Sequence, residues 1–228
     1  MERIRAKYPD VLIQACASGG GRVEFGAMKY FNEVWTSDNT EALSRTRIQY
    51  GTSLFYPATV MGSHVSATPN HQTGNITPIK LRFDIACAGR LGMELQPKRM
   101  DDAEKRFARK AVASYKAYRD IVMEGDLYRI GTPYDDTGYY GLMYVSKDKK
   151  KAVLFTYCIR YQSRTLIPKF RLHGLDAKTR YTVREQNTDK KRFWFDGGTF
   201  TGEYLANAGI NPNLSKIYDS AVFVLEAQ

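Results

Sequence analysis

The stretch from Val11 to Asp38 constrains the fold of this chain more than any other. A short apolar run at residues 11–15 leads into the small-residue loop CASGGGR at residues 16–22, and a second apolar run ends in the polar sequence WTSD at residues 35–38. Glycine lets a backbone approach a ligand closely, and an aspartate at the neighbouring tip supplies a group for proton transfer. A β/α barrel builds its site from such residues at the carboxyl ends of parallel strands.

Strand and helix patterns alternate from the start of the chain to Gly125. Buried strands are expected at residues 11–16, 34–36, 56–61 and 91–95, and helical segments at residues 25–31, 40–50 and 79–88. Asp101 and Glu104 have the spacing of a capping box, and the helix after them is expected to end at Gly125. The alternation predicts parallel βα units, with residues 1–125 as one domain.

The pattern changes after Gly125. Short runs rich in β-forming residues follow, and turn signals separate them. They fall at residues 139–145, 152–157, 169–172, 181–185 and 221–225. Residues 126–133 are expected to connect the two parts. We therefore expect residues 126–228 to form an antiparallel β-sandwich domain without a catalytic site of its own.

The composition is that of a folded chain. Of its 228 residues, 43% are hydrophobic and 13% are aromatic, which excludes a disordered chain. No apolar stretch reaches the ~18 residues of a membrane span, and the first residues do not read as a signal peptide. Three cysteines are too few, and odd in number, for a disulfide framework. We expect a cytoplasmic protein with Cys87 and Cys158 as buried, small hydrophobic residues.

The formal net charge of +10 raises the question of nucleic acid. Net charge bears on solubility and nonspecific association rather than on fold. Much of the charge falls on the helix before Gly125 and in residues 147–151, patterns typical of a solvated helix face and a hairpin turn. No nucleic-acid-binding motif accompanies it. We therefore expect neither nucleic acid nor a membrane as a partner, and a basic nucleic-acid-binding domain ranks last among the interpretations.

Four sequence blocks follow one another at a spacing typical of one enzyme family. They are CASGGGR at 16–22, WTSDNTEALSRTRIQYG at 35–51, YPATVMGSHVS at 56–66 and PNHQTGNITP at 69–78. In these blocks the chain resembles the α-galactosidases of glycoside hydrolase family 36. The resemblance is strong over about residues 10–125 and loose over the remainder. It implies a retaining α-glycosidase that acts on α-galactoside oligosaccharides, with a catalytic (β/α)8 TIM barrel and a C-terminal β-sandwich.

The resemblance also implies a missing part. Family members carry their nucleophile on an earlier barrel strand, in a block like Lys-Trp-Asp-Met-Asn, and this chain has no such block. Its first expected strand corresponds to the fifth strand of the barrel, so the N-terminal half of the barrel is an expected partner. Half a barrel exposes strand edges, which makes a homo-oligomer a further expectation. The main alternative is a non-catalytic remnant that serves a structural or carbohydrate-binding role.

Asp38 is the principal candidate for catalysis. In the family, the aspartate of the Ser-Asp-Asn block is the general acid/base, which protonates the leaving oxygen and later activates water. Judged by its position alone, Asp38 is also suited to be the N-cap of the following helix, so both interpretations stand. One nearby position departs from the family, since members usually have aspartate where this chain has Glu41.

The residues after the first strand are candidates for sugar binding. By the resemblance, Cys16, Ala17, Ser18 and Gly19 form the wall of the sugar subsite, where a thiol and backbone amides meet hydroxyl groups. Amides in a Gly-rich turn converge on an oxygen-rich ligand. The alternatives are a tight strand-to-loop turn and an inert cysteine. Arg22 is expected to hold the loop rather than to bind the sugar.

The remaining candidates have structural alternatives. Trp35 either stacks on a sugar or belongs to the core. His64 and His71 are expected in loops at the rim, where they order those loops or line outer subsites. A nucleophilic pair of Cys16 and His64 is a further hypothesis, although no other feature of such a hydrolase accompanies it. The three histidines have neither the spacing of zinc ligands nor the accompanying carboxylates of a zinc site. We therefore expect no metal and no cofactor.

Overall fold

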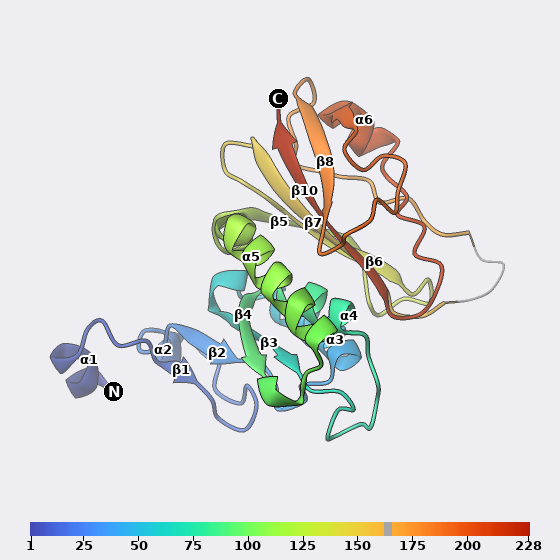
Figure 1. Ribbon diagram of the computed structural model, residues 1–228. Helices are drawn as coiled ribbons and strands as arrows, with labels where there is room; N and C mark the ends of the chain where they lie inside the picture. The colour runs from blue at the N-terminus through green and yellow to red at the C-terminus, as the bar shows by residue number, and fades with distance from the viewer. Residues whose placement is uncertain (162–165) are drawn as a thin grey trace.

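The computed structural model describes residues 1–161 and 166–228. Its strands form a four-stranded sheet in the order β1-β2-β3-β4 and a six-stranded sheet in the order β5-β6-β7-β10-β8-β9. The first is parallel throughout, and the second is antiparallel throughout. Figure 1 shows the helix α5 between the two sheets. The predicted order, a parallel α/β part followed by an antiparallel β part, is confirmed.

The parallel part alternates strands with helices. Its strands are β1 (Gln14–Ala15), β2 (Glu33–Trp35), β3 (Met61–Ser66) and β4 (Arg90–Glu94). Its helices are α1 (Glu2–Lys7), α2 (Phe25–Met28), α3 (Ala42–Thr52), α4 (Ile79–Ala86) and α5 (Asp102–Glu124), with short 3-10 turns η1 (Ala58–Val60) and η2 (Pro97–Arg99). Because the strands are parallel, their carboxyl ends lie along one edge of the sheet.

Two of the predicted strands have different bounds. The sequence predicts a strand over residues 56–61, but the chain forms the turn η1 there and β3 begins only at Met61. Pro57 precedes this turn, and proline fixes φ and has no N–H to donate to a sheet. The first strand is also shorter than predicted: Val11 and Leu12 are exposed, and β1 pairs with β2 only at Gln14–Ala15.

The antiparallel part contains strands of very different length. They are β5 (Asp126–Gly131), β6 (Tyr139–Val145), β7 (Lys151–Cys158), β8 (Arg180–Gln186), β9 (Thr199–Thr201) and β10 (Asp219–Ala227), and α6 (Gly202–Asn207) follows β9. Residues 126–133, predicted as a connection, contain the edge strand β5, which pairs with β6. The predicted strand at residues 169–172 is reduced to a single bridge between Phe170 and Ile210.

Irregular chain covers the outer face of the antiparallel sheet. The buried side chains of this layer come from α6 and from segments outside the strands, namely Phe170, Leu172, Phe195, Leu205, Ile210 and Leu214. Within residues 1–161 and 166–228, this layer contains no second hydrogen-bonded sheet. The predicted sandwich therefore takes the form of one sheet packed against loops and a short helix. Left-handed turns at Gly197 and Gly209 interrupt the extended backbone that a second sheet requires.

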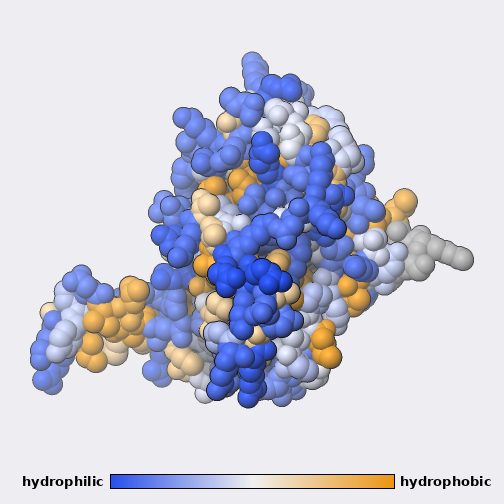
Figure 2. All heavy atoms as spheres, in the orientation of Figure 1, coloured by the Kyte–Doolittle hydropathy of each residue, from blue (hydrophilic) through white to orange (hydrophobic). Residues whose placement is uncertain are grey.

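Helix α5 begins at a side-chain cap. The Asp101 carboxylate accepts from the amide of Glu104 at 2.7 Å. The Glu104 carboxylate turns away from the helix end and pairs with Arg82 at 2.9 Å, so only half of the predicted capping box forms. The outward side of the helix carries exposed basic residues, as a solvated face predicts, and Figure 2 shows this hydrophilic surface. They are Arg106, Arg109, Lys116 and Arg119.

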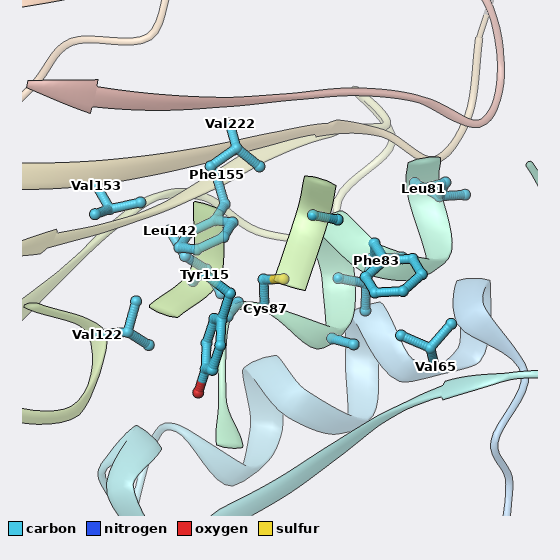
Figure 3. Close-up of a cluster of buried hydrophobic side chains, with 14 of the residues drawn as sticks. Val65, Leu81, Phe83, Cys87, Tyr115, Val122, Leu142, Val153, Phe155 and Val222 are labelled. Carbon is cyan, nitrogen blue, oxygen red and sulfur yellow. The ribbon is translucent and has the colours of Figure 1, made fainter. Parts of the chain in front are cut away.

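One apolar core joins the two parts of the structure (Figure 3). It contains Val65 and Phe83 from the parallel part, Tyr115 from α5, and Phe155 and Val222 from the antiparallel sheet. Burial of apolar surface from both parts stabilises them as one unit. Within the described ranges, no helix has both the length and the apolar character needed to cross a membrane.

Candidate active site

The Gly-rich loop begins directly after β1 and turns back on itself. The backbone of Ser18 is left-handed at φ 48°, and Gly19 and Gly20 follow at 64° and 92°. The amide of Gly21 then donates to the carbonyl of Ala17 at 2.7 Å. Successive residues in such a turn direct their amides to one side, which creates a cradle for oxygen atoms.

This loop lies against Asp38, which follows the neighbouring strand β2. A Cβ atom added to Gly19 would lie 2.4 Å from the backbone nitrogen of Asp38 and 2.8 Å from its Cγ. A Cβ atom on Gly20 would lie 2.7 Å from the carbonyl oxygen of Thr36. Only glycine permits both approaches. The structure thus brings the loop of residues 16–22 and Asp38 together at the carboxyl ends of two adjacent parallel strands.

Asp38 is not the cap of helix α3. The N-cap is Glu41, whose carboxylate accepts from the amides of Leu43 at 2.9 Å and Ser44 at 2.7 Å. A negative charge at this position also interacts favourably with the helix dipole. The capping interpretation of Asp38 is therefore wrong, and the residue that departs from the family pattern performs the capping.

The carboxylate of Asp38 is held by Trp35 instead. The indole nitrogen Nε1 donates to Oδ1 of Asp38 at 3.1 Å. Trp35 is 8% exposed, and its ring centre lies 4.5 Å from that of His64 at a tilt of 54°. Trp35 therefore belongs to the packed base of this region, and it holds Asp38 rather than offering an open face for stacking.

A buried arginine completes this cluster. Arg45, on the first turn of α3, is 1% exposed. Its guanidinium carbon lies 4.9 Å from the ring centre of Trp35, and its Nη1 donates to the hydroxyl of Thr36. Its Nε and Nη2 have no hydrogen-bond partner among residues 1–161 and 166–228. Burial lowers the pKa of Arg45 to about 10, against the opposing charge of Glu94, so the group stays cationic at neutral pH.

His64 lies on β3 rather than in a loop. The sequence predicts a strand that ends before it, whereas β3 contains it and turns its ring toward Trp35. Half-burial lowers the pKa of His64, and the nearby Arg45 cation lowers it further. The ring is therefore mainly neutral at pH 7. His71 does lie in the exposed loop of residues 67–78, as predicted.

The three cysteines lie in different surroundings. Cys16 is a free, exposed thiol at the end of β1, whereas Cys87 and Cys158 are free and buried. Burial raises the pKa of both buried thiols, as expected for inert packing residues. The pair of Cys16 and His64 finds no support, since the imidazole of His64 packs on Trp35.

In the described part of the chain, no group of three or more His, Cys, Asp or Glu side chains is arranged for a metal ion.

Two other acids lie near the site in sequence but not in a position to act with Asp38. Asp84 is fully buried on α4, where Asn187 donates to it at 2.9 Å and Ser220 at 2.7 Å. Glu94 ends β4, and β3 separates that strand from β2. Glu94 is therefore two strand spacings, about 10 Å, from β2, the strand that Asp38 follows.

Arg45 is not among the residues predicted from the sequence, and the structure places it against Trp35 and Thr36. The available signal is its position in α3, where Ala42, Thr46 and Gln49 occupy the same buried side. A charged residue on the inward face of a helix is unusual, and it is normally paired. Its contacts with Thr36 and Trp35, however, depend on how α3 packs over the end of β2.

Comparison with known proteins identifies the family. A family model described as Melibiase matches residues 1–125, and a model described as the Glycosyl hydrolase family 36 C-terminal domain matches residues 139–225. The chain belongs to glycoside hydrolase family 36. This confirms the resemblance carried by the four sequence blocks of the parallel part.

Curated and solved relatives agree with this family. The probable α-galactosidase C of Aspergillus flavus is 38% identical over 229 residues, which cover 100% of this chain and 29% of that protein. The bifunctional α-galactosidase/sucrose kinase AgaSK of Mediterraneibacter gnavus is 38% identical over 224 residues, which cover 98% of this chain and 23% of that protein. The solved structure of the α-galactosidase AgaB of Geobacillus stearothermophilus matches this structure with a TM-score of 0.91 at 34% identity. The match covers 100% of this chain and 30% of that chain. The chain thus spans 23–30% of the length of these relatives.

Proposed function

We propose that this chain is the C-terminal part of a retaining α-galactosidase and that Asp38 is its general acid/base. The contact between the Gly-rich loop and Asp38, at the ends of two adjacent parallel strands, carries the proposal. A catalytic group and a ligand cradle are adjacent there, as a β/α barrel site requires. Variants of the related AgaA enzyme of Geobacillus stearothermophilus have been solved in complex with raffinose and with stachyose, which supports an α-galactosyl oligosaccharide as substrate.

The geometry gives the two oxygens of Asp38 different tasks. Oδ1 accepts the indole N–H of Trp35, which leaves Oδ2 to carry the proton. In the first step this proton passes to the glycosidic oxygen as the bond to the sugar breaks. In the second step the same carboxylate takes a proton from the water that attacks the sugar carbon. One fixed oxygen and one free oxygen suit a group that must both give and accept a proton.

The loop after β1 supplies the sugar contacts in this proposal. Cys16 and Ala17 begin the loop, and Ser18 and Gly19 have left-handed backbones that turn their amides toward the cradle. The exposed thiol of Cys16 adds a side-chain contact. Arg22, which is exposed, remains a loop residue in this proposal rather than a ligand.

The nucleophile comes from outside these residues. A retaining enzyme needs a second carboxylate about 5–5.5 Å from the acid/base, and neither Asp84 nor Glu94 is suited to that position. We assign the nucleophile to the part of the family 36 relatives that precedes the matched segment. In the described part of the chain, β1 and β4 are the edges of the parallel sheet, so both edges are open to the strands that complete a barrel. Residues 1–125 then form the second half of the barrel, and residues 126–228 form the C-terminal domain of a cytoplasmic enzyme.

Hydrolysis of nitrophenyl α-galactoside tests the proposal. The 228-residue chain alone is expected to release no nitrophenol above a blank. The same chain fused behind the preceding part of the Geobacillus AgaA enzyme is expected to be active, and Asp38→Asn in the fusion is expected to abolish most of that activity. An Asp38→Asn fusion that folds and hydrolyses the substrate as well as the unchanged fusion would overturn the assignment. Raffinose binding to the 228-residue chain, measured by calorimetry, tests the alternative of a carbohydrate-binding remnant.

A further inference from the structure

We propose that Arg45 is a positioning residue for the acid/base. Through its contacts with Thr36 and with the ring of Trp35, Arg45 fixes the indole N–H that holds Asp38. The inference rests on the proposed function of Asp38 and extends it to a side chain that touches no reacting atom.

The first observation is that Arg45 ties down the end of β2. The residue lies on the first turn of α3, and its Nη1 returns to the hydroxyl of Thr36. The Thr36 hydroxyl in turn donates to the carbonyl of Gly62 on β3 at 3.5 Å. The segment that leads from the strand to Asp38 is therefore attached to both α3 and β3.

The second observation is that the indole has neighbours that restrict its rotation. The guanidinium carbon of Arg45 lies 4.9 Å from the ring centre, within the range of a cation–π interaction. The ring of His64 packs on the same indole with centres 4.5 Å apart. Because the N–H of an indole lies in the plane of its ring, fixing the ring fixes the direction in which Trp35 donates to Asp38.

The third observation is the cost of keeping a cation at this position. Arg45 is 1% exposed, and two of its nitrogens have no partner in the described ranges. Burying a charged group with incomplete hydrogen bonding is unfavourable, and an apolar residue on the same helix face would avoid the penalty. A side chain that is costly to bury is expected where it positions a functional group. The group that it positions here is the donor to Asp38.

Hydrogen exchange of the indole N–H tests the inference on the 228-residue chain without any activity. The chain has two tryptophans, so a nitrogen-15 spectrum shows two indole signals, and Trp194→Phe assigns them. Trp194 is 74% exposed and serves as the internal reference for fast exchange. Arg45→Met is expected to speed exchange of the Trp35 indole by about tenfold or more, because local opening becomes easier. Arg45→Lys, which keeps a cation near the ring but loses the planar fork, is expected to give an intermediate rate.

The controls separate this effect from general destabilisation. Arg47→Met changes an exposed arginine two positions along the same helix, and it is expected to leave the Trp35 signal unchanged. Thr36→Val removes the hydroxyl that Arg45 contacts at nearly constant shape, and it is expected to speed exchange as Arg45→Met does. If Arg45→Met does not fold, Thr36→Val replaces it as the test variant. A folded Arg45→Met or Thr36→Val variant with unchanged Trp35 exchange would overturn the inference.

Kinetics of the fused enzyme provide a second readout. If Arg45 acts through the acid/base, Arg45→Met lowers kcat by about tenfold or more with little change in KM. The loss is expected to be larger for raffinose than for nitrophenyl α-galactoside, because a poor leaving group depends more on the general acid. Equal losses on both substrates would contradict a positioning role. If the fused enzyme shows no activity at all, the proposed function fails, while the exchange experiment still decides the inference.

Discussion

Ser220 donates its hydroxyl to Oδ2 of Asp84 at 2.7 Å, across the junction between β10 and α4. Asn187 donates to the other oxygen, Oδ1, at 2.9 Å, and Lys80 pairs with the same carboxylate from one turn away. The hydroxyl of Tyr157 reaches the backbone carbonyl of Asp84 at 2.9 Å. A fully buried carboxylate of the parallel part is thus satisfied largely by the antiparallel part. We therefore expect the two parts to stabilise each other.

Removal of the Ser220 hydroxyl tests this dependence. Ser220→Ala is expected to lower the free energy of unfolding by about 1.5–3 kcal/mol, the usual range for a hydrogen bond to a charged group. Ser215→Ala, at an exposed serine nearby, is expected to change it by less than about 0.5 kcal/mol. Urea unfolding followed by circular dichroism measures both. Equal stability of the two variants would show that the junction does not depend on this contact.

The close approach of Gly19 to Asp38 gives a second prediction, with a matched control. Gly19→Ala and Gly74→Ala each place a side chain at a left-handed backbone, at φ 64° and 72°, and each is expected to lose about 1–2 kcal/mol for that reason. Open space surrounds Gly74, whereas a Cβ on Gly19 meets Asp38 at 2.4 Å. Only Gly19→Ala is therefore expected to shift the indole signal of Trp35. An unchanged signal would mean that the loop and Asp38 are not in contact.

The sequence contained enough to predict the position of Asp38. Local patterns, namely an apolar run, a glycine-rich loop and a polar strand end, are enough to put these residues at neighbouring strand tips. Helix α5 was equally predictable, because the spacing of its apolar residues and its cap at Asp101 are both local sequence features. Edge strand β5 was missed because Asp126 follows Gly125, a typical helix stop, and the segment then resembles a linker. Its strand character comes from pairing with β6.

Tertiary packing determined what the sequence did not reveal. The sequence offers Asp38 as a candidate N-cap of α3, whereas the cap falls on Glu41 because the chain takes three further residues to turn into the helix. The contacts of Arg45 with Thr36 and Trp35 join residues that are nine and ten positions apart, and no local rule pairs them. Such contacts become predictable only when the packing of α3 on the sheet is known.

Thiol reactivity provides a third prediction. Cys16 is exposed, whereas Cys87 and Cys158 are buried with raised pKa values. A disulfide reagent at pH 8 is therefore expected to label one thiol of the folded chain rapidly and all three in denaturant, because only thiolates react. Cys16→Ser removes the fast phase. In the fused enzyme, galactose is expected to slow the labelling of Cys16 if that residue lines the sugar subsite. Rapid labelling of two or three thiols in the folded chain would contradict the described burial.

The pH dependence of stability tests the surroundings of His64. Burial is the main cause that lowers the pKa of this imidazole, and the Arg45 cation adds to it, while Glu94 and Glu33 oppose them. Below a pH of about 6.5 the unfolded chain therefore takes up a proton that the folded chain does not. The contribution of the neutral ring to the free energy of unfolding is fully present above that pH. It is lost as the pH falls toward the pKa of His64 in the folded chain, at up to about 1.4 kcal/mol per pH unit.

Two variants isolate this contribution from other titrating groups. His64→Gln is expected to flatten the fall in unfolding free energy below about pH 6.5, since it removes the group responsible. His71→Gln, at an exposed histidine, is the matched control for this substitution. Arg45→Met is expected to raise the pKa of His64 toward its ordinary value, because it removes the nearby positive charge. Proton NMR of the His64 ring measures that shift directly, and an unchanged pKa in Arg45→Met would show that the guanidinium does not act on the imidazole.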